Sequence, residues 1–114
     1  MARIPTRLHG PAQVSNAAAT KFTVAASEKN IVRHIHIQNP SGAPVTFTAS
    51  IGADAAGTRI YDAFSIPAAA AGVTGSALDI FCYYDLDAGE IFQAFAGTNN
   101  ILVLTIDGDR IVLG

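Results

Sequence analysis

The stretch that most limits the fold of this chain is residues 30–51, where two alternating runs flank a turn. The first run, NIVRHIHIQ, puts Arg33 on the same face as Ile35 and Ile37 and puts Val32 with the histidines on the other. The second run, VTFTASI, alternates apolar side chains with Thr and Ser. A period of two is typical of a strand with one buried face, and NPSGAP between the runs is rich in turn formers. We therefore expect a β-hairpin whose core side chains are Ile35, Ile37, Phe47 and Ile51.

The rest of the chain continues the same rhythm of short strands and turns. Further strands are expected at residues 20–25, 58–66, 78–86, 91–96, 101–106 and 110–113, with part of 4–9 as an edge strand. The dipeptide Asp107-Gly108 predicts a hairpin turn, and residues 67–76 predict a small-residue loop. About eight strands without a convincing helix indicate an all-β fold, an antiparallel β-sandwich of the jelly-roll or Ig-like type. We expect residues 1–19, which contain two prolines, to be an N-terminal arm and residues 20–114 to be the sandwich domain.

The composition of the chain limits the classes of partner that the protein is expected to bind. Only 14% of the residues are charged, whereas a typical domain has about 25%, so the surface has few charges to solvate it and a homo-oligomer is expected. The formal net charge of -2 gives no basic patch for nucleic acid. No apolar segment suits a signal peptide or a membrane span, so we expect no membrane partner and a protein used in soluble form. The single cysteine, Cys82, permits no internal disulfide and is expected to be a small buried side chain.

Several apolar side chains of the later strands fall on the face that points away from the predicted core. If Phe92 and Leu102 point inward, their neighbours point outward, and the exposed aromatics of residues 78–86 extend the set. The expected interface residues are Ile91, Phe95, Ile101, Val103, Phe81 and Tyr83. Apolar surface of this kind is better placed against another subunit. The alternative is that these residues face the second sheet.

Few residues of the sequence are candidates for a metal-binding or catalytic site. His34 and His36 project side by side from one strand and are weak candidates for a metal edge, with a local spacing that resembles the His-x-His pair of iron-binding trimeric phage spike tips. No third ligand is evident, so the ordinary interpretation is two solvated or hydrogen-bonded histidines. The acidic run at residues 85–90 predicts a hairpin turn and lacks the length of a calcium loop. No Gly-x-Ser-x-Gly elbow or phosphate-binding loop is present, so we expect no catalytic residues, no cofactor and no enzyme.

Three sequence phrases follow one another between residues 10 and 108. They are GPAQVSNAAATKFTVAA, IVRHIHIQN-P-SGAP-VTFTASIG and LDAGEIFQAFAGTNNILVLTIDG. In phrase order and strand rhythm the chain resembles small β-sandwich virion proteins of tailed bacteriophages. It departs from them at Ala26-Ser27-Glu28, where such proteins often have Pro-Ala-Gly.

The resemblance implies a non-enzymatic structural protein, made in the host cytoplasm and built into the virion. Its place would be the tail, neck or adsorption apparatus, or the capsid surface as decoration. Its partners would be copies of itself, with a trimer among the expected forms, and other virion proteins. The alternative is a glycan- or metal-binding module of a host-recognition device, which would use His34, His36 and the tyrosines Tyr61, Tyr83 and Tyr84.

Overall fold

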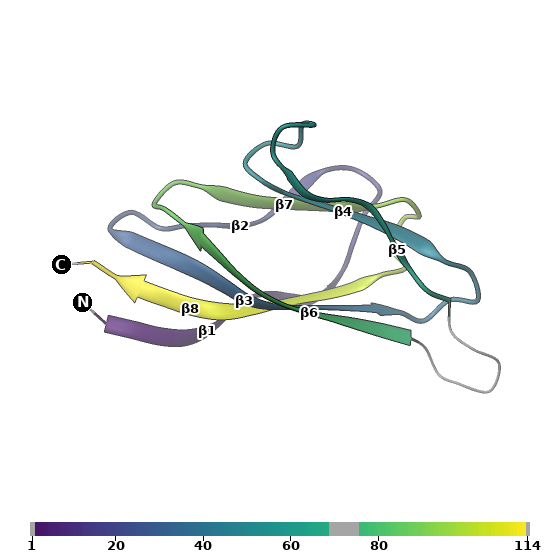
Figure 1. Cartoon of the computed structure of the whole chain (residues 1–114), viewed down its shortest axis with the longest axis horizontal. Coiled ribbons are helices and arrows are strands. Elements are labelled where there is room, and N and C mark those ends of the chain that lie inside the picture. The colour runs from purple at the N-terminus through teal and green to yellow at the C-terminus, as the bar shows by residue number, and fades with distance from the viewer. Residues whose placement is uncertain (1, 69–75, 114) are drawn as a thin grey trace.

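The computed structural model describes residues 2–68 and 76–113, and within them every regular element is a strand (Figure 1). The strands are β1 (Ala2–Gln13), β2 (Ala19–Thr23), β3 (Glu28–Asn39), β4 (Val45–Ile51), β5 (Arg59–Ile66), β6 (Ser76–Leu86), β7 (Ile91–Ala96) and β8 (Val103–Val112). In this part of the chain no helix has the length and apolar character needed to cross a membrane. Residues 69–75 of the expected small-residue loop lie outside the described residues.

The strands form two four-stranded antiparallel sheets that face each other (Figure 1). Sheet A has the order β1-β8-β3-β6, and sheet B has the order β2-β7-β4-β5. The pairing is nested: β1 pairs with β8, β2 with β7, β3 with β6, and β4 with β5. This nested pairing is that of a jelly roll, so the β-sandwich prediction is confirmed and the jelly-roll alternative is the one that applies.

Both strands of the hairpin expected at residues 30–51 are present, but they do not pair with each other, so the hairpin prediction is wrong. β3 pairs with β6 and β8, and β4 pairs with β5 and β7, so residues 40–44 carry the chain from sheet A to sheet B. The buried Asn39 side chain secures this crossing, because its Nδ2 donates to the carbonyl oxygens of Ala43 at 3.0 Å and Ile66 at 3.1 Å. Alternation alone could not reveal the error, since two strands that face one core from opposite sheets have the same pattern as two strands of one sheet.

The buried side chains between the sheets agree with the expected core. Ile35, Ile37 and Phe47 are fully buried, and Ile51 packs against them at the edge. Phe92 of β7 is also fully buried and stacks on Phe22 of β2, with ring centroids 5.5 Å apart. Burial of such side chains is the main favourable term in the stability of a sandwich of this size.

A β-bulge in β3 changes which side chains face outward. The pairing of β3 with both of its neighbours shifts register between Val32 and His34. As a result Val32 is buried in the core together with Ile35, whereas Arg33 is exposed. The predicted sharing of one face by Arg33 and Ile35 is therefore wrong, because the extra residue of a bulge interrupts the period of two.

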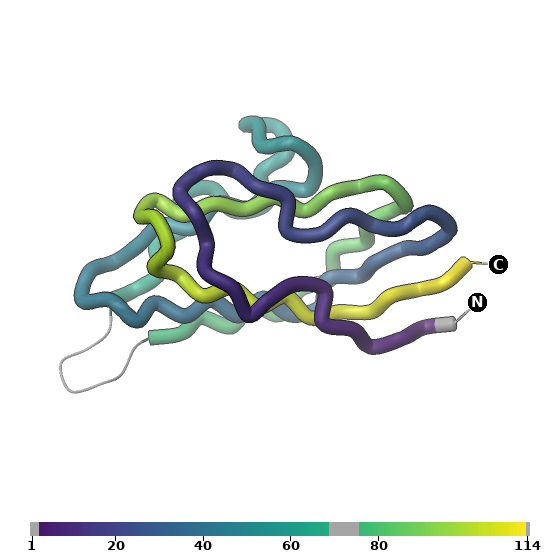
Figure 2. The backbone as a smooth tube through the Cα atoms, turned by 180° about the vertical axis from the view of Figure 1, so that it is seen from behind, coloured from purple at the N-terminus to yellow at the C-terminus, as the bar shows by residue number. Residues whose placement is uncertain are grey.

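The chain ends also differ from expectation. Asp107-Gly108 is not a turn, because β8 runs without interruption through it and pairs with β1 on one side and β3 on the other. Within the segment expected as an arm, residues 2–13 form edge strand β1, antiparallel to β8, and Val14 is fully buried in the core. Figure 2 shows β1 running beside β8, with the start of β1 and the end of β8 at the same end of the sandwich.

Candidate functional site

The six expected interface residues do not form one patch, because they lie on both sheets. Ile91 and Phe95 point outward from β7 in sheet B, since Phe92 and Ala94 between them are buried. Phe81 belongs to β6 in sheet A, on the opposite outer face. Tyr83 lies beside Phe81 on that face, Val103 begins β8 in the same sheet, and Ile101 packs against the core.

The outward face of sheet B is partly covered by the protein's own chain. Residues 52–58, which join β4 to β5, rise above this face (Figure 1), and the Asp54 amide donates to Gln93 Oε1 at 3.0 Å. The Arg59 guanidinium lies 5.7 Å from the centre of the Phe95 ring and is held by Asp54 through hydrogen bonds of 2.9 Å and 3.2 Å. Ile91 and Phe95 are consequently half-buried without any second subunit.

The outward face of sheet A carries the most exposed aromatic side chains among the described residues. Phe81 is 80% exposed and Tyr83 is 61% exposed, both on the edge strand β6. The alternation predicted for residues 78–86 is confirmed, since the residues between these aromatics pack toward the core. Arg33 lies 5.5 Å from the Tyr83 ring centre, and Phe81 stacks on His34 with ring centroids 4.7 Å apart and an interplanar angle of 12°.

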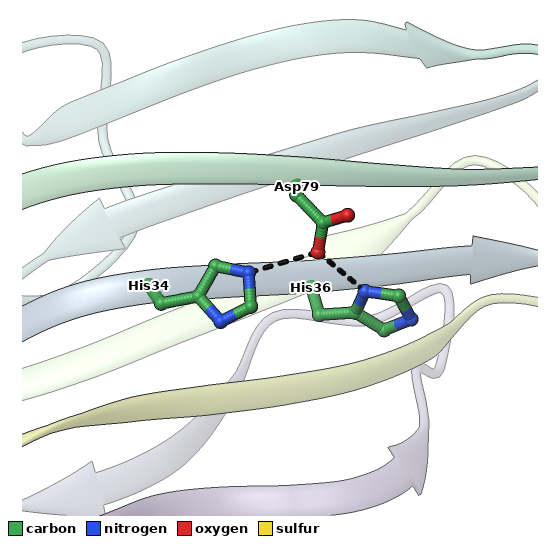
Figure 3. Close-up of side chains that lie close together, drawn as sticks. All are labelled: His34, His36 and Asp79. Atoms are coloured by element: carbon green, nitrogen blue, oxygen red, sulfur yellow. Dashed lines mark hydrogen bonds and ion pairs between the residues drawn. The ribbon is translucent and has the colours of Figure 1, made fainter.

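Beside this aromatic pair, two histidines and a carboxylate converge (Figure 3). Asp79 Oδ1 lies 2.8 Å from His34 Nε2 and 2.7 Å from His36 Nδ1. The hydrogen bonds from His36 and His34 lower the pKa of the Asp79 carboxyl, because they favour its charged form. We call His34, His36 and Asp79 the histidine cluster; their ligand atoms all lie within 4.8 Å of one another.

Sequence reasoning found the two histidines of this cluster and missed its carboxylate. Asp79 is 43 residues from His36 in the chain, and the two meet because β6 pairs with β3 in a register that sets them directly opposite. The available signal was weak: Asp79 falls on the outward face of its strand, as the histidines do. Only the pairing of the two strands turns that shared orientation into a contact.

Further charged groups border the histidine cluster. His34 Nδ1, on the far side of the ring from Asp79, lies 3.7 Å from Asp107 Oδ2 in β8, and Asp107 is in turn 3.7 Å from Arg7 Nε in β1. Two carboxylates from different strands therefore flank the two imidazoles. Paired imidazole nitrogens with a carboxylate oxygen are the donor set that divalent transition metals prefer.

The tyrosines of the alternative interpretation do not gather into a platform. Tyr61 and Tyr84 face the core edge, and their hydroxyl oxygens lie 3.2 Å apart, whereas Tyr83 points out of sheet A. Burial, the main cause, and the Tyr84 hydroxyl raise the pKa of Tyr61 above its ordinary value. Cys82 is half-buried against the core and burial raises the pKa of its thiol, in keeping with a packing role.

No protein-family model, no curated protein and no solved structure matches this chain.

Proposed function

We propose that this chain is a non-enzymatic structural component of a tailed-phage virion that oligomerises and docks on other virion proteins. Its place would be the tail, neck or adsorption apparatus, or the capsid surface as decoration. The observation that carries the proposal is the exposure of Phe81 and Tyr83 next to each other on an edge strand. Large apolar side chains that are this exposed stabilise a protein when a partner removes them from water.

Two other features support a subunit role. The jelly roll is an architecture that capsid domains use widely, and the chain's phrase order resembles small tailed-phage virion proteins. The low charged fraction of 14% also suits a molecule much of whose surface is covered in an assembly. Fold alone does not define function, so the proposal depends on the exposed surface.

Light scattering after size exclusion tests the oligomer. The unmodified chain is expected to form an oligomer, a trimer among the expected forms, and the double variant Phe81→Ser/Tyr83→Ser is expected to run as a monomer with an unchanged circular dichroism spectrum. Phe64→Ser is the matched control, because Phe64 is 44% exposed but belongs to β5 in the other sheet. An unmodified chain that stays monomeric at high concentration would contradict the proposal.

The virion assignment has a separate test in the gene neighbourhood. Flanking capsid or tail genes would support it and would also decide between decoration and tail. A position among metabolic genes, far from any structural phage gene, would overturn it.

The histidine cluster favours a second candidate function, the ligand-binding module of a host-recognition device. Such a module would use a bound metal ion, or a glycan held against Tyr83, to contact the host surface. A glycan array probed with the unmodified chain and with Tyr83→Ala tests the glycan form, and uniform absence of signal would exclude the glycans on the array.

A further inference from the structure

We propose that His34, His36 and Asp79 bind one divalent transition-metal ion, for which Zn²⁺ is the best-suited probe. The inference rests on side-chain positions alone, so it stands independently of the virion assignment and supplies the chemistry of the second candidate function. Imidazole nitrogens and a carboxylate oxygen are the ordinary protein ligands of Zn²⁺. The harder ions Mg²⁺ and Ca²⁺ are disfavoured, because they take oxygen ligands.

The distances already approach those of a metal site. A tetrahedral Zn²⁺ with bonds of about 2.0–2.1 Å separates its ligand atoms by roughly 3.3 Å. Asp79 Oδ1 lies 2.8 Å and 2.7 Å from the two histidine nitrogens. The three ligand atoms all lie within 4.8 Å of one another, so an ion fits once the carboxylate moves outward and the two histidine nitrogens approach that spacing. The side chains of His34, His36 and Asp79 are 27%, 37% and 47% exposed, which leaves them room for these movements.

The backbone holds these ligands in place before any ion arrives. His36 and Asp79 are direct cross-strand partners, and the β-bulge before His34 sets it on the same outward face. Phe81, one step along β6 on that face, stacks on the His34 ring and restricts its rotation. Ligands on paired strands are positioned more precisely than ligands on loops.

Metal binding requires that the proton of each neutral histidine lie on the ring nitrogen that does not face Asp79. With no ion bound, Asp79 accepts a hydrogen bond from each histidine, which needs a proton on His34 Nε2 and on His36 Nδ1. A metal ion takes the place of these two protons, and each neutral imidazole then carries its proton on its other nitrogen. For His34 that nitrogen is Nδ1, which lies 3.7 Å from Asp107 Oδ2, so Asp107 favours the tautomer that binds metal.

The charges that face the cluster also favour a cation. Asp79 of β6 and Asp107 of β8 bring negative charge, and Arg7 of β1 lies on the far side of Asp107. Three protein ligands leave at least one coordination position open toward solvent, for water or for a donor of a bound partner. An open position on an exposed sheet face is accessible to a second macromolecule.

Calorimetric titration of the untagged chain with Zn²⁺, and metal content after dialysis, test the proposal. One Zn²⁺ per chain is expected for the unmodified protein. His36→Ala and Asp79→Ala are each expected to weaken binding by about 10-fold or more, and Asp107→Asn by less. His9→Ala is the matched control, since it removes a histidine of β1 outside the cluster and should leave binding unchanged.

The outcomes separate the possibilities. Absence of Zn²⁺ binding would overturn the site while leaving the oligomer test of the virion proposal intact. Equal affinity of Asp79→Ala and the unmodified chain would show that a bare His-x-His pair binds adventitiously, and would also overturn it.

Discussion

At the scale of single residues, Gly108 has a structural role different from the one that its sequence context predicts. As half of an Asp-Gly pair it predicts a turn, yet it lies buried within β8 between two neighbouring strands. A Cβ at this position would collide with the carbonyl oxygen of Ile31 in β3, which is backbone and cannot move away cheaply. The glycine is therefore required by close strand approach rather than by turn geometry.

The substitution Gly108→Ala is expected to lower the free energy of unfolding by about 1–3 kcal/mol, because the methyl group forces β3 and β8 apart. Urea denaturation followed by circular dichroism measures the change. Gly57→Ala is the control, since no atom lies within 4 Å of its added Cβ, and it should change stability by no more than about 0.5 kcal/mol. Equal effects of the two substitutions would contradict the close-approach explanation.

At the scale of elements, residues 52–58 act as a cover over sheet B. Asp54 binds Arg59, and Arg59 in turn lies over the Phe95 ring. The Arg59 hydrogen bonds hold the pKa of the Asp54 carboxyl below its ordinary value of 3.8. This ion pair links the connection between β4 and β5 to the outward side chains of β7.

The stability that the Asp54 carboxylate contributes is expected to decrease as the pH is lowered. A pKa that is lower in the folded state gives stability that is present above about pH 4 and is lost as the pH falls through the folded value. Asp54→Asn should therefore show a smaller drop in urea midpoint than the unmodified chain between about pH 6 and about pH 2.5. Asp62→Asn is the control, because Asp62 is the more exposed carboxylate partner of Arg59. This variant should keep most of the drop in urea midpoint seen in the unmodified chain. An unchanged drop in Asp54→Asn would exclude this ion pair as its source.

At the scale of the whole molecule, one core joins the two sheets, and Phe92 lies fully buried in it. The stacked Phe22 ring links β2 to β7 on the core side of sheet B. Because the strands of a jelly roll pair across the length of the chain, loss of this core affects all of them together.

Phe92→Ala is expected to reduce the free energy of unfolding by about 3–5 kcal/mol, through lost burial and the cavity left behind. Phe64→Ala removes the same side chain from a site that is 44% exposed, and should cost about 1 kcal/mol or less. Thermal unfolding of the two variants compares them directly. Similar losses in both would mean that Phe92 is not central to the core.

The sequence by itself determined where most of the strands lie and most of their inward faces. Residues such as Ile35, Phe47 and Phe92 could be assigned to a core because the period of two is a local property, written in neighbouring residues. The two histidines could likewise be placed on one outward face.

The tertiary structure alone decided which strands pair. It separated β3 from β4, ran β8 through Asp107-Gly108 and divided the expected interface between two opposite faces. It also set Asp79 between His34 and His36, which turns a weak pair into a three-ligand cluster. The physical reason is that every one of these outcomes depends on register between strands far apart in the chain, which local alternation leaves open.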